Sequence, residues 1–122
     1  NASLKIAGLG FCWGGGVVNV LATAAADLDA GIVFYGVSPR LDDVVKIKAR
    51  MQMHYAGLDT RINETVPAYE EALKKARVKY EMFTYEKVNH AFHNDTGKER
   101  YAEASARLAW SRALDFLRST IR

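Results

Sequence analysis

The chain has 122 residues, of which 49% are hydrophobic and 25% are charged, a composition typical of one globular domain. Its net charge is only +3, and its cations stand in short groups that alternate with acids, so we interpret them as solvated faces and expect no nucleic-acid partner. No apolar run approaches the roughly 20 residues of a membrane span, and one cysteine cannot form an internal disulfide. We therefore expect a cytoplasmic protein with no membrane partner, although a leader removed before Asn1 would leave no trace.

Strand and helix signals alternate along the chain. In order, they predict a strand over 4–10, a helix over 14–26, a strand over 30–36, one or two helical turns within 37–48, a strand over 50–56, a loop over 58–63, a helix over 64–77, a strand over 79–85, a loop over 86–97 and a helix over 99–121. This order predicts an α/β fold with a mostly parallel sheet and flanking helices. We expect one domain over residues 1–122, and four strands make a small sheet for this class.

Local signals sharpen two of the helices. Either Asn63 or Thr65 is expected to cap the helix over 64–77, and Pro67 fits its first turn. On the last helix, one apolar stripe is expected from the helical spacing of Trp110, Leu114, Leu117 and Ile121.

The only cysteine lies in a glycine-rich turn, Gly8-Leu9-Gly10-Phe11-Cys12-Trp13-Gly14-Gly15-Gly16, between the first strand and the first helix. A nucleophile on such a turn needs a strained backbone, and small residues two positions away let neighbouring segments pack closely. The helix N-terminus favours negative charge and should lower the pKa of the Cys12 thiol, while the backbone N–H of Trp13 would face a developing oxyanion. The alternative is a buried, inert cysteine.

Other glycine motifs do not fit this turn. A dinucleotide fingerprint that begins at Gly8 would need glycine at position 13, which is Trp13. A phosphate-binding loop from Gly10 to Gly15 would need lysine at position 16, which is Gly16.

A general base and an orienting acid follow Cys12 in the order expected of α/β hydrolases. Asp59 comes after the predicted strand over 50–56, and His90 comes after the strand over 79–85. Parallel strands end at one edge of a sheet, which is where open α/β sheets build their sites. The three residue types, their order and their positions at strand ends together predict a Cys-His-Asp triad.

The remaining histidines have simpler interpretations. His54 lies inside a predicted strand and is expected to pack or hydrogen-bond, and His93 competes with His90 as base but lies farther from the strand end. A metal site of Cys12, Asp59, His90 and His93 is compatible with the ligand types, but its spacing does not support zinc. We expect no metal and no cofactor.

These motifs resemble the dienelactone hydrolase family of α/β hydrolases. The resemblance is carried by Gly10-Phe11-Cys12-Trp13-Gly14-Gly15, Phe34-Tyr35-Gly36, Ala56-Gly57-Leu58-Asp59 and Asn89-His90-Ala91-Phe92. It implies that Cys12 is the nucleophile, His90 the base and Asp59 the orienting acid, in a cofactor-free hydrolase of esters or lactones. Family members are about twice as long, which implies that this chain is the C-terminal part of a larger α/β-hydrolase domain. The segment from Phe92 to Thr96 lacks the arginine with which the best-known members bind a substrate carboxylate.

We therefore expect hydrolysis of a small-molecule carboxylic ester or lactone, dienelactone-like in class, through an acyl-cysteine intermediate. A thioesterase or peptidase on the same scaffold would give the same pattern. The alternative of another class is a non-enzymatic α/β binding or assembly module, inactive as an isolated half-domain. Its exposed sheet edge could form a homo-oligomer or pair with a separate N-terminal half.

Overall fold

The computed structural model describes residues 5–86 and 100–121. Its strands are β1 (Ala7–Phe11), β2 (Ala30–Phe34), β3 (Arg50–Ala56) and β4 (Tyr80–Tyr85), and they form one parallel sheet in the order β1-β2-β3-β4. Its helices are α1 (Trp13–Ala24), the 3-10 helix η1 (Leu41–Lys46), α2 (Thr60–Asn63), α3 (Val66–Lys75) and α4 (Arg100–Thr120). The predicted α/β class with a parallel sheet is confirmed.

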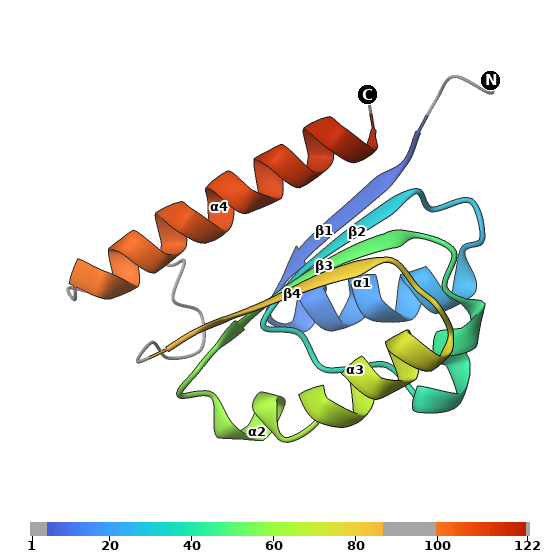
Figure 1. Cartoon of the computed structure of the whole chain (residues 1–122), viewed down its shortest axis with the longest axis horizontal. Coiled ribbons are helices and arrows are strands. Elements are labelled where there is room, and N and C mark those ends of the chain that lie inside the picture. The colour runs from blue at the N-terminus through green and yellow to red at the C-terminus, as the bar shows by residue number, and fades with distance from the viewer. Residues whose placement is uncertain (1–4, 87–99, 122) are drawn as a thin grey trace.

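Helices cover both faces of the sheet. In Figure 1, α1 and α3 lie on one face and α4 crosses the other face alone. The core beneath α1, η1 and α3 takes its strand residues from positions that alternate along β2 and β3, such as Val33, Met51, Met53 and Tyr55. The intervening positions, Ile32, Phe34 and Ala56, belong to the second core, beneath α4. Every residue of β2 is buried, as a strand between two helical layers requires.

Two local predictions were wrong. The segment 58–63 is not only a loop, because α2 forms within it with Asp59 as its N-cap residue. Neither proposed capping side chain caps α3: Thr65 occupies the N-cap position but its hydroxyl donates to the carbonyl oxygen of Ile62. The amide of Asn63 donates to the carbonyl oxygens of Ala56 and Gly57 instead, which fixes the end of β3.

The predicted stripe on α4 is also partly wrong. The residues that α4 buries most deeply against the sheet are Ala109, Ala113 and Phe116. Leu117 and Ile121 pack at the border of this core, whereas Trp110 remains 46% exposed. Small alanines bring the helix axis close to β2 and leave the bulkier tryptophan at the side of the contact.

Among the described residues β1 and β4 are the two edge strands of the sheet, and the edge at β1 is bordered by exposed apolar side chains. β1 pairs only with β2, and several large apolar side chains on and beside β1 and α1 are exposed: Ile6, Leu9, Val17, Val20 and Leu21. None of the helices in the described ranges is both long enough and apolar enough to cross a membrane.

Candidate active site

Cys12 is the single residue between β1 and α1, and its backbone is strained. Its φ of 55° and ψ of −121° lie in a region that side-chain-bearing residues rarely adopt. Two hydrogen bonds hold this geometry. The N–H of Cys12 donates to the carbonyl oxygen of Phe34 at 3.0 Å, and its own carbonyl oxygen accepts from the N–H of Gly16 at 3.2 Å. The turn is therefore clamped to the end of the neighbouring strand and to the first turn of the helix.

Of the two glycines that lie two positions from Cys12, only Gly10 is required by close backbone packing. A Cβ at Gly10 would overlap the backbone of Gly14 and lie 2.8 Å from the nitrogen of Gly15. A Cβ at Gly14, which we expected to be equally restricted, would meet nothing within 4 Å. The second close approach lies instead between Gly15 and Gly36, where a Cβ on Gly36 would lie 2.8 Å from the Cα of Gly15. The sequence pattern did not predict that pair, and Gly36, two residues after the end of β2, is its signal on the strand side.

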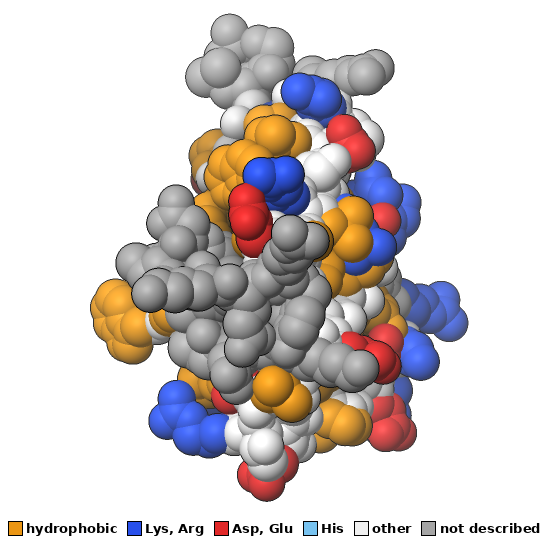
Figure 2. All heavy atoms as spheres, turned by 90° about the vertical axis from the view of Figure 1, so that its left-hand side faces the viewer, with side chains coloured by type: hydrophobic (Ala, Val, Ile, Leu, Met, Phe, Trp, Pro, Cys, Tyr) orange, Lys and Arg blue, Asp and Glu red, His pale blue; other side chains and the backbone are white. Residues whose placement is uncertain are grey.

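Asp59 lies at the same edge of the sheet as Cys12, at the carboxyl ends of the parallel strands. It follows β3, and as the N-cap of α2 its Oδ1 accepts from the N–H of Ile62 at 3.5 Å. Its carboxylate is close enough to act electrostatically on the Cys12 thiol. Figure 2 faces this end of the molecule, where charged side chains of both signs are scattered among hydrophobic ones. The structure thus brings two of the three predicted triad residues to one edge.

The pKa of the Cys12 thiol is raised above its ordinary value. Partial burial is the larger cause, and the negative charge of Asp59 is the second. This direction is opposite to the one that we expected from the N-terminus of α1. Both causes penalise the thiolate form and favour the neutral thiol.

The third predicted residue, His90, and its rival His93 lie outside the described residues. The α1 N–H of Trp13, predicted as an oxyanion donor, belongs to the first helical residue after Cys12, where N–H groups have no intrahelical acceptor. Its indole side chain is 84% exposed.

His54 is structural, as predicted. It is fully buried in β3, stacks on Phe34 with ring centroids 4.5 Å apart, and is hydrogen-bonded through both ring nitrogens. Nδ1 lies 2.8 Å from the hydroxyl of Tyr85, and Nε2 lies 2.8 Å from Oε1 of Gln52. Burial, helped by the charge of Arg112, lowers the pKa of His54 to about 3.

The surrounding bonds fix the roles of the two imidazole nitrogens. The amide nitrogen of Gln52 donates to Glu81 and to the carbonyl oxygen of Arg112, so its oxygen is left to accept from Nε2–H of His54. The hydroxyl of Tyr85 accepts from Arg112 at 3.2 Å and donates to Nδ1. A neutral His54 therefore joins β3 and β4 to α4 beneath the candidate site, and it has no free nitrogen for catalysis.

The chain is similar to known proteins in sequence and in fold. The profile of the dienelactone hydrolase family matches residues 1–121. A relative from Saccharolobus solfataricus, provisionally named a carboxymethylenebutenolidase, is 41% identical over 115 residues, which cover 93% of this chain and 44% of the relative. A carboxymethylenebutenolidase homolog from Mus musculus is 37% identical over 90 residues, covering 72% of this chain and 37% of its own.

A solved structure is similar to this chain in fold. A crystal structure from Klebsiella pneumoniae, provisionally named a dienelactone hydrolase, superposes with a TM-score of 0.78 at 31% identity, covering 88% of this chain and 49% of its own. The chain thus spans less than half the length of each of these relatives. The family profile matches nearly the whole sequence, and this chain belongs to the dienelactone hydrolase family.

Proposed function

We propose that this chain forms the C-terminal part of a hydrolase domain that cleaves a carboxylic ester or lactone through an acyl-cysteine intermediate. The observation that carries the proposal is the strained backbone of Cys12 at a strand-to-helix turn, with the Asp59 carboxylate at the same sheet edge. Backbone strain that the surrounding structure maintains is typical of functional positions. The names of the relatives support the same class of reaction.

In the proposed first step, the sulfur of Cys12 attacks the substrate carbonyl carbon while His90 takes the thiol proton. A C–S bond forms, and the carbonyl oxygen becomes an oxyanion that accepts a hydrogen bond from the N–H of Trp13. The tetrahedral intermediate then collapses and the C–O bond of the ester breaks. His90 gives its proton to the departing alkoxide, and the acyl-cysteine remains.

In the second step, water hydrolyses the acyl-cysteine. His90 takes a proton from the water as its oxygen attacks the thioester carbon, and the Cys12 sulfur leaves and recovers that proton. The products are a carboxylic acid and the free enzyme, so the reaction needs no oxidant, metal or organic cofactor.

Asp59 has two opposite electrostatic effects in this scheme. Its charge disfavours a resting thiolate on Cys12, as the raised pKa of the thiol indicates. The same charge favours the imidazolium that His90 becomes when it takes the proton. Proton transfer is then expected to occur together with attack on the substrate, which protects the resting thiol from unproductive alkylation and oxidation.

Acyl trapping tests the nucleophile. The complete protein is mixed with 4-nitrophenyl acetate, 4-nitrophenol release is followed, and the acetylated residue is located by mass spectrometry. We expect a burst, acetyl on Cys12, and loss of turnover by roughly 10⁴-fold or more in Cys12→Ala. Acetylation elsewhere, or full activity of Cys12→Ala, would show that the nucleophile is wrong. No turnover and no acetylated residue in the complete protein would make a non-enzymatic module the better interpretation.

A matched pair of histidine variants tests the base. We expect His90→Ala to abolish the burst and His93→Ala, the same change three residues later, to retain it. The reverse result would assign the base to His93. Comparing an open-chain ester with a five-membered lactone in the same assay then identifies the preferred substrate class.

A further inference from the structure

Two short segments of the chain carry only positive charge. Residues 46–50 read Lys-Ile-Lys-Ala-Arg, and residues 74–79 read Lys-Lys-Ala-Arg-Val-Lys. The first segment leads into β3 and the second joins α3 to β4. Because β3 and β4 are adjacent and parallel, both segments meet at the amino end of the sheet. We expected these cations on dispersed solvated faces, and the fold instead gathers them at one end. Their seven charges exceed the net +3 of the whole chain, so the rest of the chain carries more acids than bases.

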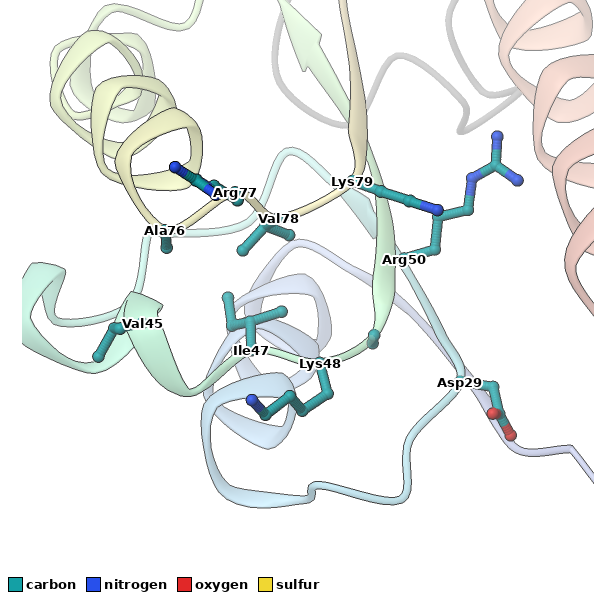
Figure 3. Close-up of a pocket in the computed structure, with 10 residues that line it drawn as sticks. Asp29, Val45, Ile47, Lys48, Arg50, Ala76, Arg77, Val78 and Lys79 are labelled. Atoms are coloured by element: carbon teal, nitrogen blue, oxygen red, sulfur yellow. The ribbon is translucent and has the colours of Figure 1, made fainter.

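A pocket of about 490 Å³ lies between these segments. Its volume is within the range of small-molecule sites. The residues that line it are Asp29, Val45, Ile47, Lys48, Ala49, Arg50, Ala76, Arg77, Val78 and Lys79. In Figure 3, Ile47 and Val78 extend toward each other from the two segments, while the long side chains of Lys48, Arg77 and Lys79 extend outward from them in three different directions. The pocket therefore combines an apolar centre with a cationic border.

Three of these cations have no acidic partner within the part of the chain that the structure describes: Lys48, Arg77 and Lys79. The guanidinium of Arg50 lies over the ring of Phe116, 5.5 Å from its centroid, and so faces α4. Cations that gather at one end of the sheet without counter-charges repel one another, and a bound anion would relieve that repulsion.

The acid that lines the pocket is already engaged. Asp29 Oδ2 accepts from the N–H of Ile6 at 2.7 Å. In Figure 3 it lies on the side of the pocket away from Arg77. Its carboxylate therefore does not neutralise the Arg77 end of the pocket.

Arg77 occupies a position that favours glycine. It follows α3 with a φ of 60°, its N–H donates to the carbonyl oxygen of Lys74, and the N–H of Val78 donates to that of Leu73. These two bonds define a Schellman motif, in which the left-handed residue is usually glycine. An arginine there adopts a disfavoured backbone conformation. Backbone strain of this kind is typical of functional positions, which makes the guanidinium of Arg77 a candidate binding group.

We propose that this pocket binds a phosphoryl group with at least two negative charges, at the end of the sheet opposite to Cys12 and Asp59. The guanidinium of Arg77 is suited to bind two phosphoryl oxygens at once, and the flexible side chains of Lys48 and Lys79 add ammonium charges at the border of the same pocket. A phosphorylated small molecule and a phospholipid headgroup present the same chemistry. A ligand held here would leave the candidate active site open.

Inorganic pyrophosphate is the first probe, measured by isothermal titration calorimetry at constant ionic strength. The test variant is Arg77→Gly, because glycine suits the left-handed position and a loss of binding would not come from unfolding. The matched control is Arg61→Gln, which removes one exposed positive charge from α2 at the opposite end of the sheet. Lys79→Gln is a second test variant that leaves the Schellman motif intact.

We expect saturable binding of pyrophosphate that weakens roughly tenfold or more in Arg77→Gly and in Lys79→Gln, and less than about twofold in Arg61→Gln. Sedimentation with phosphatidylcholine vesicles that contain phosphatidic acid distinguishes the two sources. Binding to these vesicles that depends on Arg77 supports a lipid headgroup, and pyrophosphate binding without it supports a small molecule. The proposal is wrong if neither probe binds, or if Arg61→Gln weakens binding as much as Arg77→Gly does.

Discussion

A methyl group added at Gly10 and one added at Gly14 should change the free energy of unfolding in opposite directions. In Gly10→Ala the new Cβ would overlap the carbonyl group of Gly14 and lie 2.8 Å from the nitrogen of Gly15. All three atoms belong to backbone, so the first turn of α1 must move away from β1. Overpacking of this kind costs 1–3 kcal/mol and sometimes more. We expect Gly10→Ala to lower the free energy of unfolding by about 3 kcal/mol.

Gly14→Ala is the matched control. Its Cβ would lie in open space, its φ is not positive, and alanine favours the helical backbone over glycine. We therefore expect a gain of about 0.5 kcal/mol, somewhat less than in a helix interior. Urea unfolding followed by circular dichroism measures both variants, and an unchanged m-value would show that the comparison is valid. The reasoning is refuted if Gly10→Ala stays within about 1 kcal/mol of the parent, or if Gly14→Ala is equally destabilising.

Three further predictions concern titration and buried hydroxyls. The pKa of His54 is about 3 in the folded chain against an ordinary 6.5, so only the unfolded chain gains a proton at this residue between pH 7 and pH 5. The free energy of unfolding should therefore fall by about 2 kcal/mol over this range. Urea unfolding at the two pH values measures this loss, which should be missing in His54→Gln. Tyr69→Phe should lower the free energy of unfolding by about 1–3 kcal/mol because it leaves the buried Oδ1 of Asn19 unpaired. Tyr55→Phe should be neutral or stabilising because the buried hydroxyl of Tyr55 has no partner among the described residues. Equal costs in urea unfolding would contradict this. Asp59→Asn should shift the iodoacetamide alkylation of Cys12 to lower pH because one cause of the raised thiol pKa is removed, and an unchanged pH profile would contradict that cause.

The sequence predicts the elements well where the pattern is strong. The strand over 50–56 has the predicted bounds, since β3 contains a buried run that begins after the exposed Arg50 and is followed by Gly57. The face of α4 was predicted less well because helical spacing favours the bulky Trp110. Packing selects Ala109 and Ala113 instead, and which alanines approach the sheet depends on the partner surface of β2.

In the candidate site, too, the positions of residues along the fold could be predicted from the sequence, but their surroundings could not. Cys12 and Asp59 could be placed at one sheet edge because a parallel sheet aligns its strand ends. The direction of the thiol pKa could not be predicted, because it depends on burial and on the proximity of a carboxylate that only the folded chain brings near. The basic pocket was missed for a related reason: 46–50 and 74–79 are separated along the chain and become neighbours only when β3 pairs with β4.

The order of the strands has a consequence for how the chain folds. Each strand pairs with the next one in sequence, so the sheet can grow by joining successive strand–helix units as synthesis proceeds, each through one helical crossover. The second core forms later, because Ile32 and Phe34 are covered by α4, which follows all four strands in the sequence. Until α4 docks, one face of the growing sheet stays apolar and open to other chains. We expect a chain that ends before α4 to aggregate even though it contains all four strands.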